Sequence, residues 1–329
     1  MKELPEQKKI RDLIHLADRE LVKVNELSRV NLDNQSYPIF SFEIGCKELE
    51  APTLGLFGGV HGLERVGTHV IISYLQSLFK QMKWDGDLRE LLKTSRIVSI
   101  PLINPGGMAL KWRANPNGVD LMRNAPVEAV SDNLPFLICG HRLTNKIPWY
   151  RGKLGSKMEL ESETLVNYVR REVFSSELAL TIDFHSGFGI KDRFWYPYAK
   201  TKRQFARIRE VQVLKDLLDD TLPHHIYSIE PQSYSYTTHG DLWDFLFDEH
   251  QKKGSNNIFI PWTLEMGSWN WVRKNPKQLF NLLGLFNPII EHRYDRTMRR
   301  HKALIDFLFS ATRNKSWLNG QLYCFDRQS

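Results

Sequence analysis

Cysteine is scarce in this sequence, and long apolar runs are missing. The 329 residues include only three cysteines, Cys46, Cys139 and Cys324, which are far apart and odd in number. They provide neither a disulfide framework nor a C-x-x-C metal site, so a bound metal would need histidine and carboxylate ligands. No stretch approaches the roughly 20 apolar residues that span a bilayer, and the charged start MKELPEQKKIRDL does not resemble a signal peptide. We therefore expect a cytoplasmic protein with no membrane partner.

The excess of positive charge is modest. The formal net charge is +7, and the cations are spread along the chain with acidic residues between them. The densest cluster, RYDRTMRRHK over residues 293–302, has helical periodicity and is typical of a solvated helix face. We therefore expect no nucleic-acid partner, and the oligomeric state stays open.

Hydrophobic periodicity divides the chain into alternating strands and helices. Short apolar or alternating runs predict strands over residues 37–44, 53–57, 96–103, 178–184 and 258–266. Helical spacing of apolar residues predicts helices over residues 6–29, 63–82, 159–174, 202–220, 276–288 and 291–310. This order predicts an α/β fold with a mixed, largely parallel twisted β-sheet and helices on both faces.

Neither a repeat nor a low-complexity linker interrupts the chain, which predicts a single domain over residues 1–329. Residues 1–35 are predicted to be an N-terminal helical extension. This extension is too short for a separate inhibitory domain, so we expect no activation by cleavage. Residues 125–155 are rich in Pro, Gly and Asn and predict a long surface excursion. As an alternative, Trp149 and Tyr150 in this segment could line a restrictive pocket mouth.

His61 and Glu64 form the only H-x-x-E in the chain, after a strand and a glycine-rich turn and before a predicted helix. Residues three apart share one face of a helix, so the imidazole and the carboxylate can converge on one ion. His185, at the end of a later strand, is the natural third ligand, because a catalytic zinc takes three protein ligands and a water. With 11 histidines in the chain, an H-x-x-E also arises by chance. These residues alone leave a metal site and an ordinary polar turn as alternatives.

Residues 103–126 read INPGGMALKWRANPNGVDLMRNAP, and here the chain resembles the zinc carboxypeptidase family. That family carries an N-P-D-G turn, a following arginine and then G-V-D-L-N-R-N-F-P. Residues 151–169, RGKLGSKMELESETLVNYV, are similar to its glycine turn and S-E-P-E-T helix start. The H-x-x-E, D-x-H-S and late glutamate follow in the family's order, so the resemblance covers about residues 50–270. It implies a zinc carboxypeptidase-like, phosphorylase/hydrolase-like α/β domain.

The resemblance implies that His61, Glu64 and His185 bind one Zn²⁺ per chain. It implies that Glu265 is the general base and that Arg113 polarises the scissile carbonyl group and stabilises the oxyanion. Zinc lowers the pKa of its bound water, and a nearby carboxylate can accept the proton as that water attacks.

By the same resemblance, the Asp120 carboxylate orients His61, as carboxylates beside metal-binding histidines commonly do. Arg123 matches the arginine that binds the terminal carboxylate of the substrate, which a guanidinium can hold through two hydrogen bonds.

The family pattern breaks at Met122, where an asparagine normally helps to hold the terminal carboxylate. A methionine side chain donates no hydrogen bond, so the usual recognition of a C-terminal amino acid is in doubt. A tyrosine also caps the pocket in many relatives. Tyr236 or Tyr234, in the stretch SYSYTTHGDLW, could take this place.

Two strand ends, D-F-H-S-G and T-L-E-M-G, look like those of a neighbouring branch, aspartoacylase and succinylglutamate desuccinylase. We predict a metallocarboxypeptidase that hydrolyses the amide bond next to a terminal carboxylate in a small peptide. The alternative is an N-acyl amino acid deacylase with the same zinc site. A further alternative, an inactive binding protein on this fold, is disfavoured because the three ligands, the base and the oxyanion arginine are all present.

Overall fold

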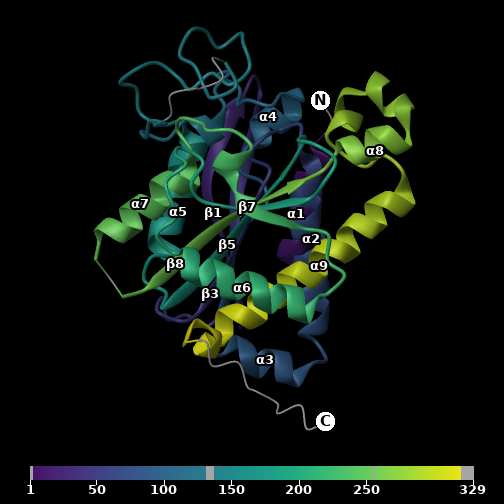
Figure 1. Ribbon diagram of the computed structural model, residues 1–329. Helices are drawn as coiled ribbons and strands as arrows, with labels where there is room; N and C mark the ends of the chain where they lie inside the picture. The colour runs from purple at the N-terminus through teal and green to yellow at the C-terminus, as the bar shows by residue number, and fades with distance from the viewer. Residues whose placement is uncertain (1–2, 131–136, 255, 320–329) are drawn as a thin grey trace.

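One mixed β-sheet of eight strands runs through the protein (Figure 1). The computed structural model describes residues 3–130, 137–254 and 256–319, so Cys324 lies outside the described residues. The strands are β1 (Val22–Leu32), β2 (Gln35–Gly45), β3 (Thr53–Gly58), β4 (Arg96–Ile100), β5 (Leu178–Ser186), β6 (Arg193–Tyr196), β7 (Ser228–Pro231) and β8 (Ile258–Met266). They lie side by side in the order β1-β2-β4-β3-β5-β8-β6-β7.

The centre of the sheet is parallel, and antiparallel pairs flank it. The strands β4, β3, β5 and β8 run in one direction, whereas β2 pairs antiparallel with β4 and β6 pairs antiparallel with β8. Every residue of β3, β4 and β5 is buried, as expected for parallel strands that are covered on both faces. The five predicted strands all belong to this sheet, as β2, β3, β4, β5 and β8.

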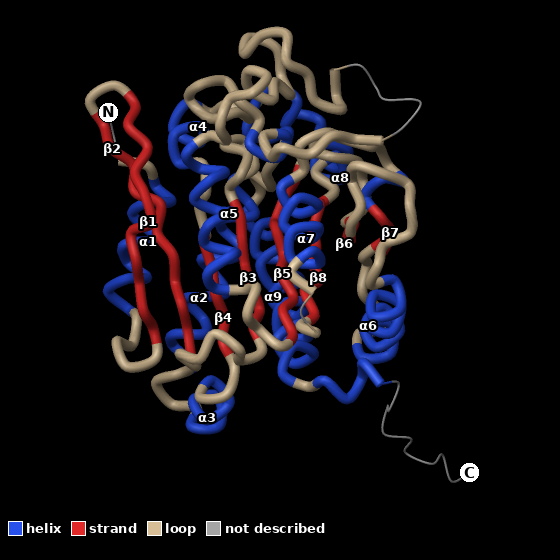
Figure 2. Tube along the Cα trace, turned by 90° about the vertical axis from the view of Figure 1, so that its left-hand side faces the viewer, coloured by secondary structure: helices blue, strands red, loops and turns tan. Residues whose placement is uncertain are grey.

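Helices cover both faces of the sheet. On one face α2 (Arg65–Gln81) and α9 (Glu291–Arg313) pack against β3 and β5, and α1 (Pro5–Leu16) packs on α2. On the other face lie α5 (Leu160–Glu172) and α7 (Leu242–Lys252), which Figure 2 shows in front of the strands. The predicted α/β fold is confirmed. The remaining α-helices of the described chain are α3 (Gly86–Leu92), α4 (Pro105–Leu110), α6 (Ile208–Thr221) and α8 (Trp269–Lys274).

The N-terminal prediction is wrong beyond the first helix. The helix predicted over residues 6–29 ends at Leu16, and residues 22–32 form the edge strand β1 instead. Residues 1–35 are therefore not a helical extension, because their second half belongs to the sheet. Apolar residues of this stretch fit both a helical and an alternating spacing. The antiparallel pairing with β2 favours the strand, because it gives the backbone N–H and C=O groups of both segments hydrogen-bond partners.

A second correction concerns residues 276–288, where the sequence predicts a helix. The chain forms two short 3₁₀ turns there, η3 (Pro276–Phe280) and η4 (Leu282–Leu285). The Asn281 side chain accepts hydrogen bonds from two of the following backbone N–H groups. Such a local side-chain cap competes with the backbone hydrogen bonds of a regular helix.

Residues 125–155 contain neither a helix nor a strand among those that the structure describes, apart from isolated bridges, and residues 131–136 lie outside the description. The irregular conformation is as predicted, but the segment is not only a surface excursion. Cys139, Tyr150 and Arg151 are buried. The segment therefore packs onto the body of the protein.

One cluster of buried apolar side chains reaches from Leu4 in the N-terminal segment to Trp317 near the end of the described chain. The single domain over residues 1–329 remains a prediction. Among the described residues, no helix combines the length and the apolar character that crossing a membrane requires.

The buried face of α1 provides a test of how this helix packs on the core. Ile10 is 1% exposed, so Ile10→Ala should lower the free energy of unfolding by about 2–5 kcal/mol, through lost burial and the cavity left behind. Lys9→Ala, at an exposed neighbouring position, should change it by less than about 0.5 kcal/mol. Urea unfolding followed by circular dichroism measures both. Equal stabilities of the two variants would show that α1 is not packed on the core.

Candidate metal centre and active site

The carboxyl ends of β3, β5 and β8 lie at one edge of the sheet and carry the polar residues of the site. The strand β5 pairs in parallel with both neighbours, and its register places His185 beside Glu265. His61 and Glu64 follow the end of β3, in the turn that leads into α2. Parallel strands therefore bring together residues that are far apart in the sequence, as is general for sites in open α/β sheets.

Two glycines shape the turn between β3 and α2. Gly59 has a φ of +66°, in the left-handed region that favours glycine. A Cβ atom on Gly62 would lie 2.2 Å from the carbonyl carbon of Gly107 in α4, so no larger residue fits without moving the backbone. The turn is thus held against α4 while its two polar side chains face β5.

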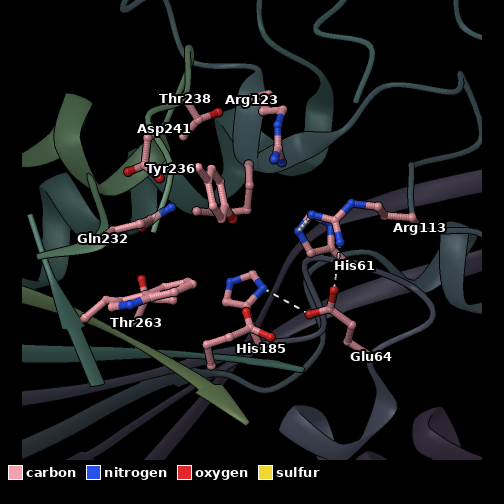
Figure 3. Close-up of a pocket in the computed structure, with 13 residues that line it drawn as sticks. His61, Glu64, Arg113, Arg123, His185, Gln232, Tyr236, Thr238, Asp241 and Thr263 are labelled. Carbon is pink, nitrogen blue, oxygen red and sulfur yellow. Dashed lines mark hydrogen bonds and ion pairs between the residues drawn. The ribbon is translucent and has the colours of Figure 1, made fainter. Parts of the chain in front are cut away.

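His61, Glu64 and His185 converge as predicted (Figure 3). One ligand atom of each lies within 4.8 Å of the others, and the three residues are 2%, 2% and 4% exposed. Glu64 Oε2 lies 3.1 Å from His185 Nδ1. Within the described ranges, His61 Nδ1 has no hydrogen-bond partner, which is costly for a buried polar atom. Buried imidazoles and a carboxylate that face one point fit a divalent cation such as zinc.

Arg113 lies against two of these candidate ligands. Its Nη1 is 2.9 Å from Glu64 Oε1, and its Nη2 is 2.8 Å from His61 Nε2. Its Nε donates a hydrogen bond to Asp120 Oδ2 at 3.0 Å. The guanidinium is therefore anchored at one end by Asp120 and points its other end into the ligand cluster.

Asp120 is a buried carboxylate beside the ligand cluster and is 1% exposed. Its Oδ2 accepts hydrogen bonds from Arg113 and from Arg123 Nη1, each at 3.0 Å. Its Oδ1 is 3.8 Å from His61 Nδ1, beyond hydrogen-bond distance. Although burial opposes it, the charges of the two arginines hold the pKa of Asp120 well below its usual range. The structure thus places Asp120 beside His61, but its carboxylate accepts its hydrogen bonds from the two arginines and, at Oδ1, from the Met122 backbone N–H.

Burial and neighbouring charges shift the pKa values of the site in opposite directions. Burial and the Arg113 charge lower the pKa of His61 to about 3, which leaves the neutral imidazole that metals bind. Burial acts to raise the pKa of Glu64, but His61, His185 and Arg113 lower it to about 2. Burial and the Glu64 charge raise the pKa of Glu265 to about 8. The two glutamates therefore differ in protonation at neutral pH.

Asp183 supports His185 from within β5. Its Oδ2 lies 2.8 Å from His185 Nε2, although the angle is not that of a hydrogen bond, and it accepts a hydrogen bond from Trp243 Nε1. Burial acts to lower the pKa of His185, but the charges of Asp183 and Glu64 raise it well above the usual value. A carboxylate behind a histidine increases its basicity as a metal ligand.

The predicted ligands open onto a cavity of about 360 Å³ that also contains Glu265, Met122, Arg123 and Tyr236. Glu265 is buried, and its Oε1 accepts a hydrogen bond from the Phe188 backbone N–H at 2.9 Å. All predicted site residues except Asp120 therefore line one cavity, and Asp120 contacts it through the two arginines.

The structure distinguishes between the two candidate tyrosines. Tyr236 is half-buried, lines the cavity and packs against Phe188 and Trp195. Tyr234 is 72% exposed and does not line it. Of the two, only Tyr236 is placed to contact a substrate.

Five further residues line the cavity and were missed by sequence reasoning, namely Trp195, Gln232, Thr238, Asp241 and Thr263. Asp241 carries a signal that could have been used, because it precedes an apolar run and caps α7 through the backbone N–H groups of Trp243 and Asp244. Trp195 and Thr263 have no such signal in the sequence, because only the antiparallel register of β6 and β8 brings them together.

The motif order, the ligand geometry and the sheet agree with a comparison to known families. The sequence model of one family, described as zinc carboxypeptidase, matches residues 27–271. The chain belongs to the zinc carboxypeptidase family. The predicted family is confirmed, and its name implies zinc for the cluster of His61, Glu64 and His185.

Relatives of this chain include much longer proteins. Carboxypeptidase SOL1 of Arabidopsis thaliana is 28% identical over 107 residues, which cover 32% of this chain and 22% of that protein. Mouse carboxypeptidase Z is 22% identical over 294 residues, covering 82% of this chain and 42% of the relative. The chain thus spans less than half the length of either. Bovine thrombin-activatable fibrinolysis inhibitor shares the fold, with a TM-score of 0.66 and 14% identity over 94% of this chain and 97% of that one.

The close approach of Gly62 to α4 can be tested by adding one methyl group. Gly62→Ala should lower the free energy of unfolding by about 1–3 kcal/mol, since the backbone must move to relieve the overlap. Gly86→Ala is the matched control, because its added Cβ meets nothing within 4 Å at the start of α3. It should be neutral or stabilise the protein by up to about 1 kcal/mol. Urea unfolding of both variants checks this, and a neutral Gly62→Ala would contradict the described turn.

Proposed function

We propose that this chain is a zinc-dependent metallocarboxypeptidase that hydrolyses the amide bond next to a terminal carboxylate. The observation that supports this most is the convergence of His61, Glu64 and His185 in one buried cluster that opens onto the cavity of Glu265 and Arg123. Metal ligands, a base and a cation for the substrate's carboxylate are then within one small space. Small peptides are the proposed substrates.

His61, Glu64 and His185 would hold one zinc ion. Bound there, zinc would lower the pKa of a coordinated water and polarise the carbonyl group of the substrate. The lowered pKa values of Glu64 and His61 favour the ionised carboxylate and the neutral imidazole that metal binding requires, whereas the raised pKa of His185 means that this ligand would release a proton on binding.

Glu265 is the proposed general base. It lies beside His185 in the neighbouring strand, and the Phe188 N–H fixes one of its oxygens. Its pKa of about 8 arises from burial and from the nearby Glu64 charge, so a cation held by Glu64 would lower it towards neutrality. A carboxylate of this kind can accept a proton from water and pass it to the departing amine.

Arg113 is proposed to stabilise the negative charge that develops on the carbonyl oxygen. Its Nε stays bound to Asp120, while Nη1 and Nη2 contact Glu64 and His61. A metal held by those two residues would compete with the Nη atoms for them, which would leave these atoms available to the oxygen. A cation held in advance where charge develops commonly lowers the barrier by a few kcal/mol.

Arg123 is proposed to bind the terminal carboxylate, with Tyr236 at the same end of the cavity (Figure 3). Its own position is secured by hydrogen bonds to Asp120 and to the Ile138 carbonyl oxygen. Met122 cannot supply the amide that the family pattern expects beside it. Gln232, which also lines the cavity, is our candidate for that donor.

The absent amide at Met122 keeps a second candidate function open, an N-acyl amino acid deacylase with the same zinc site. Both reactions cleave an amide beside a carboxylate and require the same ligands and base. An inactive binding protein is less well supported, because no ligand or base is missing from the cavity.

Metal analysis and a substrate screen test the proposal together. We expect about one zinc per chain in the purified protein and loss of most of it in Glu64→Ala, since a ligand carboxylate is removed. Glu90→Ala, at an exposed glutamate of α3, should keep the zinc. The screen compares peptides that have a free C-terminus with N-acyl amino acids. Faster turnover of the peptides supports the carboxypeptidase. Absence of zinc after reconstitution would overturn the hydrolase proposal.

The role of Glu265 is tested separately from metal binding. Glu265→Gln keeps the size of the side chain but cannot accept the proton, so kcat should fall by roughly 10²–10⁴-fold. Zinc content should stay at the wild-type value, because Glu265 is not one of the three ligands. Steady-state kinetics and metal analysis of the same preparation give both numbers. A variant with wild-type kcat would remove Glu265 from the mechanism.

A further inference from the structure

A second, larger hollow adjoins the active-site cavity. It encloses about 1340 Å³, including its open mouth. Its apolar walls come from four segments, the turn between β3 and α2, the chain after α4, residues 145–149 and η4, and we call it the tryptophan groove. The apolar side chains that define it are Leu63, Trp112, Ile147, Pro148, Trp149 and Leu282.

The tryptophan groove adjoins the active-site cavity at Arg113, which lines both spaces, and Asp120 lines the groove and accepts a hydrogen bond from Arg113. Arg123 lines the cavity but not the groove. Figure 3 shows Arg113 on one side of the cavity, with Gln232 and Asp241 on the opposite side. A substrate that extends past Arg113, in the direction away from Arg123, would therefore enter the groove.

Apolar surface and strained backbone coincide in the groove. Trp112 is 51% exposed and Leu282 is 54% exposed, so large apolar side chains face solvent there. Trp149 has a φ of +70° and Lys111 a φ of +56°, a conformation that is rare outside glycine. Two of the three such residues in the described chain thus line this one groove. Backbone strain of this kind is commonly retained where it positions side chains for function.

We propose that the tryptophan groove binds the acyl side of the substrate and selects a bulky apolar group there, such as an aromatic side chain next to the scissile bond. This inference rests on the proposed function. With the carbonyl group at Arg113 and the terminal carboxylate at Arg123, the rest of the substrate extends into the groove. An acetyl group offers far less apolar surface to the groove than an aromatic side chain does. The exposed cations Lys111 and Lys146 on its rim disfavour a basic side chain.

This assignment answers the question that the sequence leaves open about residues 125–155. Trp149 lines a substrate path, as the pocket-mouth alternative expects, whereas Tyr150 is buried. The path is wide rather than restrictive. The groove therefore favours a peptide over a small N-acyl amino acid.

The test uses the zinc-loaded protein and two substrates with the same C-terminal amino acid, chosen as the best in the screen. One carries an acetyl group and the other a benzyloxycarbonyl-phenylalanyl group. Trp112→Ala and Trp149→Gly remove the two indoles, and glycine is used at position 149 because of its positive φ. Each variant should lower kcat/KM for the large substrate by roughly 10-fold or more, chiefly through KM. The acetyl substrate should be unaffected.

A binding measurement makes the result independent of turnover. Calorimetry with benzyloxycarbonyl-phenylalanine should show binding roughly 10-fold weaker in each variant than in the wild type. Trp84→Ala, at a tryptophan that is 77% exposed and outside the groove, is the matched control and should bind normally. Zinc content and thermal melting confirm that each variant is folded.

The possible outcomes distinguish a failure of the groove proposal from a failure of the proposed reaction. Binding that depends on Trp112 and Trp149 without turnover of either substrate supports the groove and overturns the proposed function. Turnover of both substrates with no effect of either variant overturns the groove and leaves the carboxypeptidase standing. An equal loss for both substrates also overturns it, because the indoles would then not act on the acyl side.

Discussion

The carboxylate of Asp120 accepts hydrogen bonds from two arginines at a single oxygen, and the arrangement of the site depends on this pairing. Arg113 reaches from it towards the metal ligands, and Arg123 reaches towards the far part of the cavity. A buried carboxylate without these cations would be costly, and the nearly buried Arg123 needs the anion equally. One residue thus positions both cations that the proposed reaction uses, one at the scissile carbonyl group and one at the terminal carboxylate.

Charge balance extends from Asp120 through the whole cluster. Glu64 is paired with Arg113 and His185, and His185 in turn lies on Asp183. In a buried cluster every such group needs a partner of opposite charge, so a change at one site alters its neighbours. The same network explains why Arg113 lies beside the candidate metal ligands. Its positive charge pairs with Glu64 and lies next to His61, the two residues that would otherwise face a metal ion.

The network lies at one edge of the open sheet, between the active-site cavity and the tryptophan groove. The parallel strands place the ligands and the base at one edge, and the loops beyond that edge form the walls. On one side of Arg113 those walls are polar and small, and on the other they are apolar and wide. Residues 145–149 of the irregular segment form part of this second side, so a long loop borders the site, which its composition alone does not indicate.

Local patterns in the sequence determined the five predicted strands. The short motifs H-x-x-E, D-F-H-S-G and G-V-D-L-x-R-N determined the resemblance to the family, and through it the predicted ligand trio, because each motif can be read from neighbouring positions. Only the tertiary structure decided that residues 22–32 join the sheet, that Tyr236 rather than Tyr234 lines the cavity, and that two tryptophans border a groove. These features depend on pairing and packing between distant segments. The spacing of residues along the chain indicates which of them share one face of a helix or strand. It does not indicate which distant strand or side chain packs against that face.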